Sequence, residues 1–204
     1  GMGKSATVAH ALEHLRARER GLIVLRGRCH ERETVPFNAF DGVVDDLSRA
    51  LRALEEGGGA LPVVSPAVLR LFPMLAAVPG LAPLAEAAGQ GGASVEQRRQ
   101  AFAGLRALMD AVAARRPVVV VLEDSHWADA ESLLLLEAWA EAPAPRVLLV
   151  ATARPGPDGD PCAAFRSAGP AARRLRLEPL GDAEAHALVA AMSRAEGAPP
   201  SVEA

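Results

Sequence analysis

Aromatic residues and cysteines are scarce in this sequence. Aromatic side chains make up 3% of its 204 residues, and tyrosine is absent. A core therefore has to be built mainly from Ala, Val and Leu, which suits helices packed on a parallel sheet. The two cysteines, Cys29 and Cys162, lack CxxC spacing and do not stand at a cation-rich helix start, which argues against a disulfide framework and against a reactive thiol. A reducing compartment, the cytoplasm, is the expected location.

A strong charge of one sign and long apolar runs are also missing. The formal net charge is -3, so no whole-chain field would recruit nucleic acid or an anionic membrane. Prolines and Arg70 interrupt the most apolar stretch, Leu61–Ala88, well short of the roughly 18 uninterrupted apolar residues that a membrane span requires. We expect residues 57–93 to form a Pro/Gly/Ala-rich helical elaboration, with no membrane partner and no direct binding of nucleic acid.

Predicted helices and strands alternate along the chain. Apolar periodicity, capping residues and helix breakers predict helices at Ser5–Arg20, Phe37–Glu56, Ser94–Arg116, Glu131–Glu141 and Asp182–Arg194. Apolar and β-branched runs predict strands at Leu22–Cys29, Val118–Asp124, Arg146–Arg154 and Arg173–Leu180. This alternation predicts a three-layer α/β domain with a mostly parallel sheet and right-handed crossovers.

The chain opens with GMGKS, in which Gly3, Lys4 and Ser5 fit the last three letters of the phosphate-loop pattern G-x-x-x-x-G-K-[ST]. Glycines let consecutive amides curl around phosphates, and the N-terminus of the following helix adds partial positive charge. We predict Gly1, Gly3, Lys4 and Ser5 as nucleotide-binding residues, with Ser5 as a Mg²⁺ ligand. The first glycine of the pattern would lie three residues before Gly1, so the same letters also fit an ordinary helix cap.

Two acidic residues and an arginine end predicted buried strands. Glu123 and Asp124 close the run VVVVLED, and Arg154 closes the next strand. In a phosphate-loop enzyme one carboxylate at such a strand end holds the Mg²⁺ shell, and a second polarises the attacking water. A guanidinium beside them suits a phosphate oxygen. We predict Glu123, Asp124 and Arg154 as catalytic, with Glu123 also at the metal. Which acid takes which role stays open, and charges solvated at strand ends are the alternative.

The block EDSHWAD (123–129), with LLVATARP after it and VLRGRCHERETVPFNAF before it, resembles the ATPase regions of STAND proteins, signal-transduction ATPases with numerous domains. It is similar in particular to the ATPase region found behind bacterial serine/threonine kinase domains and within large LuxR-type regulators. The resemblance covers nearly the whole chain. It implies a P-loop sheet of strand order 5-1-4-3-2, with Arg154 in the sensor-1 position. It also implies slow turnover of ATP with Mg²⁺, used as a conformational switch for kinase, helical-repeat or DNA-binding segments of a longer chain.

The resemblance also implies segments that these residues do not supply. It places a strand before the phosphate loop, and this first, loop-bearing strand is missing from the chain although it would be central in that strand order. We therefore expect the backbone groups along one edge of the strand at 147–152 to lack a partner strand, or this strand to pair in a different order. We assign residues 1–180 to the ATPase core and residues 181–204 to the start of an incomplete helical lid.

Three other functions compete with this interpretation. His10, Glu13 and His14 spell H-x-x-E-H, a zinc-peptidase motif for which Glu86 or Glu96 would have to be the third ligand. A solvated helix face is the simpler interpretation of that motif. The chain could also be a non-catalytic or degenerate interaction module of the same parent protein. A DNA-loading AAA-type ATPase is a further alternative, against which the acidic charge balance argues.

The side chains that follow the acidic pair carry separate expectations. His126 is expected to approach the nucleotide or a neighbouring segment, and Trp127 is expected to pack in the core. Asp129 is expected to cap a helix rather than to bind a ligand.

Overall fold

The computed structural model of the chain describes residues 2–31, 36–89, 94–140, 146–155 and 172–195. Its α-helices are α1 (Lys4–Arg18), α2 (Asn38–Glu56), α3 (Pro66–Leu71), α4 (Ala82–Ala88), α5 (Val95–Ala113), α6 (Ala130–Ala140) and α7 (Asp182–Ala195). Its short 3-10 helices are η1 (Pro73–Ala77), η2 (Pro79–Leu81) and η3 (Ser125–Trp127). Its strands are β1 (Ile23–Arg28), β2 (Val118–Glu123) and β3 (Leu148–Ala151). The predicted alternation of helices and strands is therefore confirmed up to β3.

The three strands form a parallel sheet in the order β1-β2-β3. The register pairs Ile23 with Val118, Arg28 with Glu123, Val119 with Leu148, and Leu122 with Ala151. Because the strands are parallel, their C-terminal ends meet at one edge of the sheet, where open α/β sheets place ligands. The order agrees with the 4-3-2 part of the order that the resemblance implies. Among the described residues β3 pairs with β2 alone.

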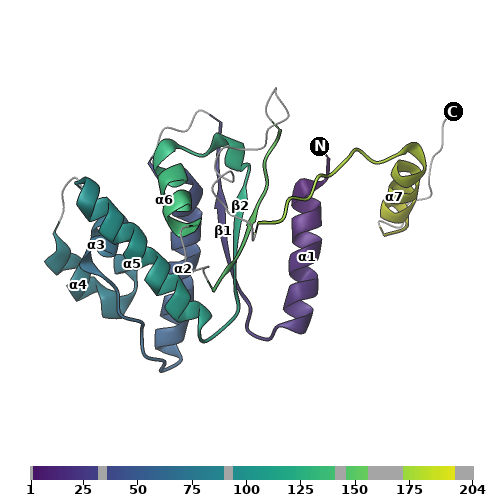
Figure 1. The fold of residues 1–204 in the computed structure, drawn as a ribbon. Coiled ribbons are helices and arrows are strands. Elements are labelled where there is room, and N and C mark those ends of the chain that lie inside the picture. Colours follow the sequence, from purple (N-terminus) through teal and green to yellow (C-terminus); the bar gives the residue numbers. More distant parts are fainter. Residues whose placement is uncertain (1, 32–35, 90–93, 141–145, 156–171, 196–204) are drawn as a thin grey trace.

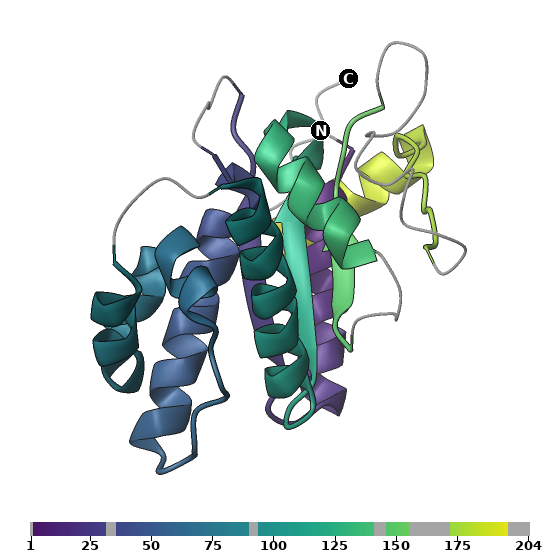
Figure 2. The same cartoon turned by 60° about the vertical axis from the view of Figure 1, so that its left-hand side comes forward.

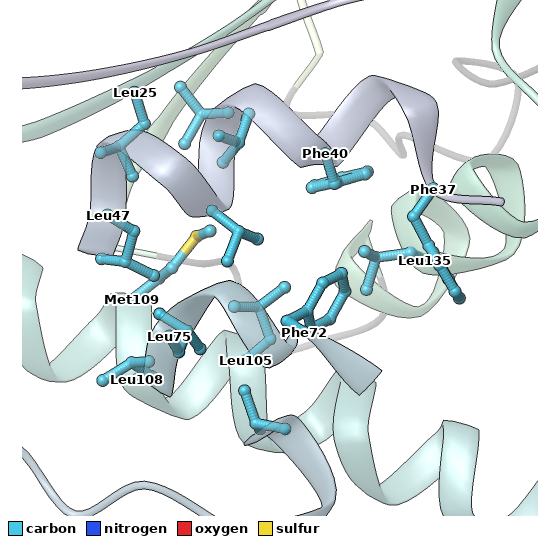
Figure 3. Packing of buried hydrophobic residues seen from close by; sticks show 14 of the residues in the cluster. Leu25, Phe37, Phe40, Leu47, Phe72, Leu75, Leu105, Leu108, Met109 and Leu135 are labelled. Atoms are coloured by element: carbon cyan, nitrogen blue, oxygen red, sulfur yellow. The ribbon is translucent and has the colours of Figure 1, made fainter. Parts of the chain in front are cut away.

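Helices cover both faces of this sheet (Figures 1 and 2). On one face lies α1, where Leu12 packs against Val119 and Val121. On the other face α2, α5 and α6 enclose a larger core, whose packing around Phe40 and Phe72 is shown in Figure 3. The central strand β2 is covered on both sides, and its first five residues are all buried. An uninterrupted apolar run is what such a strand requires, so the three-layer α/β interpretation is confirmed.

The proline-rich stretch forms a group of short helices between α2 and α5. The elements α3, η1, η2 and α4 pack on one another, with α3 also against α5 and η1 also against α2. Each of the four has a proline in its first two positions, where the missing amide hydrogen costs nothing and the fixed φ favours the helix. None of the helices in the described ranges is long and apolar enough to cross a membrane.

The predicted strand at Arg173–Leu180 is wrong. Residues 172–180 have no regular secondary structure, and both Leu175 and Leu180 are exposed. The alternation of apolar and polar residues predicted a strand, but a strand forms only where a neighbour satisfies its backbone groups. In the described part of the chain, residues 172–180 pair with no strand of the sheet, whose order is β1-β2-β3. This segment leads to α7, which lies apart from the sheet in Figure 1.

Asp129 joins α6 to α2 near the C-terminal edge of the sheet. Its carboxylate accepts hydrogen bonds from the amides of Glu131 and Ser132 at the start of α6, which confirms the predicted cap. It also accepts from the amides of Phe37 and Asn38 at the start of α2, at 3.1 and 3.0 Å. Partial burial raises the pKa of Asp129, but hydrogen bonds from Ser132, Phe37 and Asn38 lower it by more, so the pKa lies below its ordinary value.

Replacing Asp129 with alanine is expected to lower the free energy of unfolding by about 2 kcal/mol, because two helix starts each lose an acceptor worth about 1 kcal/mol. Urea denaturation followed by circular dichroism measures the change. Asp45→Ala is the matched control, since Asp45 is an exposed carboxylate on α2 whose loss should stay within about 0.5 kcal/mol. Equal stability of the two variants would show that the double cap contributes nothing.

Candidate functional site

The start of α1 meets the end of β2. Gly3 precedes α1 with φ of 73°, a left-handed conformation that favours glycine, and Lys4 begins the helix. The Ser5 hydroxyl donates a hydrogen bond to Oε2 of Glu123 at 3.3 Å, across 118 residues of sequence. The fold thus brings the predicted loop residues and the first predicted acid together, while Gly1 lies outside the described residues. Of the two acids whose roles were left open, Glu123 is the one in contact with Ser5.

Lys4 is the only lysine in the sequence, and arginine supplies the other 21 of its 22 basic side chains. It is half-buried at the first position of α1, one residue before Ser5. Lysine offers a compact ammonium on a flexible stem, whereas arginine offers a broad planar fork. The one lysine of the chain therefore stands where the phosphate-loop pattern requires a lysine. This preference for lysine over arginine supports a role for Lys4 beyond that of a surface charge.

Asp124 follows β2 in a strained but tolerated conformation. Its φ of 52° is left-handed, which aspartate adopts more readily than most residues. Its amide donates to Oγ1 of Thr152 at 3.1 Å, and Arg28 donates to its carboxylate at 3.5 Å. The two acids therefore have different neighbours, Ser5 for Glu123 and Arg28 for Asp124. Sequence reasoning missed Arg28 and Thr152, although both lie at polar ends of predicted strands.

Arg154 and His126 meet beyond the end of β3. The backbone amide of Arg154 donates to Nδ1 of His126 at 3.4 Å, and the Arg154 side chain is exposed. Burial lowers the pKa of His126; the Asp124 carboxylate raises it, and the cations of Arg154 and Lys4 lower it further, leaving it below its ordinary value. His126 is thus near three of the predicted site residues, which confirms that it approaches a neighbouring segment.

The expected burial of Trp127 is wrong. Its side chain is 41% exposed, and its ring lies against that of His126 with 5.0 Å between centroids. An aromatic residue after a buried strand was expected in the core. The turn η3 instead buries Ser125 at the end of β3 and leaves Trp127 near the surface.

A hollow of about 410 Å³ opens beside the site, at the C-terminal end of β1. Its lining includes Arg26, Arg28, Asn38, Asp41 and Glu123. Neither Lys4 nor Ser5 lines it, so the hollow borders the predicted phosphate site through Glu123 and is not the phosphate cradle itself.

In the described part of the chain, no third ligand joins the two histidines of the zinc-peptidase alternative. His10 and His14 lie on the exposed side of α1 with their Nε2 atoms 3.1 Å apart. Within the described residues no three His, Cys, Asp or Glu side chains are grouped so as to hold a metal ion. A catalytic zinc site uses three protein ligands and an open position. The exposed side chains of His10, Glu13 and His14 agree with the simpler interpretation of a solvated helix face.

The groups that meet at this edge fit a Mg²⁺ ion and a phosphate group. A hydroxyl and a carboxylate in contact are hard oxygen donors of the kind that Mg²⁺ prefers, and a helix N-terminus with a lysine beside them suits an anion. Together with the parallel sheet, these features define a P-loop ATPase-like domain.

Residues 1–150 match the family model of the AAA ATPase domain, so the chain belongs to that family. Membership supports binding of a nucleotide, and the family in general binds ATP with Mg²⁺. No curated protein and no solved structure matches the chain.

Proposed function

We propose that this chain is the ATP-binding, slowly hydrolysing module of a regulatory switch, part of a larger cytoplasmic signalling protein that carries kinase, helical-repeat or DNA-binding segments. The observation that carries the proposal is the 3.3 Å contact between Ser5 and Glu123, which joins the loop motif to the acidic strand end. The resemblance of the EDSHWAD block to STAND ATPases supports the signalling role.

Each predicted residue then has a distinct task. Lys4 binds the β- and γ-phosphates, and Ser5 and Glu123 hold Mg²⁺, which when bound neutralises phosphate charge. Asp124, next to Glu123 and paired with Arg28, orients the attacking water and accepts its proton. Arg154 contacts the terminal phosphate from the end of β3.

The hydrogen bonds around Thr152 support the switch. Asp124 and Ser125 donate to Thr152, so the end of β2 is tied to the residue two places before Arg154. A ligand shifts a conformational equilibrium only by binding one state more tightly than the other. Contacts made to a triphosphate and absent with a diphosphate would act on this link. We propose that the change passes along the chain after β3 to residues 181–204, the start of the helical lid.

Replacing Ser5 with alanine is expected to weaken Mg-ATP binding about tenfold, because a hydroxyl bonded to a charged group contributes about 1.5 kcal/mol. The phosphate-loop pattern extends upstream of Gly1, so binding is measured by calorimetry on the chain together with the residues that its gene encodes there, termed the extended chain. Affinity for ATP without Mg²⁺ should change less than twofold. Glu13→Ala, an exposed position about two turns further along α1, is the control and should leave both affinities unchanged.

The alternative is a non-catalytic interaction module. An extended chain that binds no nucleotide at millimolar concentration would favour it over our proposal. Salt-dependent binding of the isolated domain to DNA would instead favour the DNA-loading ATPase.

A further inference from the structure

His126 is held in place by its neighbours on both sides of the sheet edge. It lies in η3, directly after β2, where the buried Ser125 donates to the carbonyl of Thr152 through both its amide and its hydroxyl, at 2.8 and 3.0 Å. Its own ring accepts the amide hydrogen of Arg154. Residues from the ends of two strands therefore fix the imidazole.

The hydrogen bond to Arg154 also selects the tautomer. Because Nδ1 is the acceptor, a neutral imidazole carries its proton on Nε2. The Nε2 atom is buried and has no hydrogen-bond partner among the described residues. A buried donor without an acceptor is destabilising, and in native structures such a group calls for an explanation in terms of function.

The charges that act on this ring are those of the proposed phosphate site. Burial lowers the pKa of His126, and Asp124 at the end of β2, Arg154 beyond β3 and Lys4 at the start of α1 all act on its ring, with a net pKa below the ordinary value that favours the neutral form. An N–H donor on which the cations of Arg154 and Lys4 also act suits an anionic oxygen that arrives with the ligand.

We propose that His126 is a phosphate-sensing residue, whose Nε2–H donates a hydrogen bond to the terminal phosphate of a bound nucleoside triphosphate. This inference rests on the proposed function and adds to it a residue that distinguishes triphosphate from diphosphate. The terminal phosphate is the expected partner because His126 lies on the Arg154 side of the acidic pair, bound to the same residue that we expect at that phosphate.

Two substitutions of His126 test the roles of its two ring nitrogens one at a time. In His126→Asn the side-chain oxygen can still accept the Arg154 amide hydrogen, but no donor remains at the position of Nε2. In His126→Gln the longer side chain places an amide donor near that position. Calorimetry on the extended chain should show that His126→Asn weakens ATP binding about tenfold with ADP affinity changed less than twofold. His126→Gln should retain most of the preference for ATP.

Imidazole nitrogen shifts of the wild-type protein, measured by NMR, provide a second readout that does not depend on variants that fold. In the nucleotide-free protein we expect Nδ1 of His126 to be unprotonated and Nε2 to be protonated. Addition of Mg-ATP, but not of Mg-ADP, should shift the Nε2 signal. Equal losses of ATP and ADP affinity in His126→Asn, or an Nε2 signal that ATP leaves unmoved, would overturn the inference while the proposed function stands. A wild-type extended chain that binds neither nucleotide would overturn both.

Discussion

Replacing Lys4 with alanine is expected to weaken Mg-ATP binding by about 100-fold. Removal of one partner from a charged contact costs about 2–5 kcal/mol, and 100-fold corresponds to about 2.7 kcal/mol. Lys4→Arg should restore only part of the affinity, because a planar guanidinium does not replace a compact ammonium. Lys4 is the sole lysine in the sequence, so no second lysine within residues 1–204 can take its place.

Isothermal titration calorimetry of the extended chain with Mg-ATP measures this effect. Arg16→Ala is the matched control, since it removes an exposed cation from the same helix three turns away and should leave the affinity within twofold. An unchanged affinity in Lys4→Ala would mean that the GKS letters are a helix start and not half of a phosphate loop.

Replacing Gly27 with alanine is expected to lower the free energy of unfolding by about 3 kcal/mol or more, because β1 and α2 touch backbone to backbone. A Cβ atom on Gly27 would lie 1.9 Å from the carbonyl oxygen of Ala39, and one on Gly42 would lie 2.5 Å from that of Arg26. Both obstacles are backbone atoms, which cannot rotate away, so the helix has to move from the sheet. For a domain of this size the melting temperature should fall by about 6–12 °C.

Gly181→Ala is the control for this substitution. A Cβ atom at Gly181 would meet only the Glu184 carboxylate at 3.7 Å, which is ordinary contact. Its melting temperature should therefore stay within about 2 °C of the parent. A Gly27→Ala variant as stable as Gly181→Ala would show that α2 is not packed directly on β1.

Local patterns were sufficient to predict the three strands of the sheet and the contact between Ser5 and Glu123 at its edge. The run VVVVL predicted a strand buried on both faces, and the polar residues at strand ends predicted where chemistry would lie. The positions of Glu123 and Arg154 at the ends of predicted strands, and of Ser5 at the start of a predicted helix, marked them as candidates. Parallel strands bring their C-terminal ends to one edge whatever their separation along the chain.

Features that depend on a distant partner were not predictable in this way. The alternating residues at 173–180 have strand periodicity, but a strand needs a neighbour that local sequence does not specify. Asp129 was recognisable as the cap of α6, whereas its bonds to Phe37 and Asn38 cross more than 90 residues. Gly27 was visible only as a small residue in a strand, and its close approach to Ala39 became apparent from the packing.

The most direct test of the account is whether Mg-ATP protects Lys4 from an amine-reactive reagent. Because the sequence has one lysine, mass spectrometry of its peptide follows one ε-amine, with the N-terminal amine as internal reference. We predict that saturating Mg-ATP slows modification of Lys4 at least tenfold, while adenosine, which has no phosphates, leaves the rate unchanged. A Lys4 modification rate that Mg-ATP does not alter would contradict the proposal that this edge of the sheet binds a nucleotide.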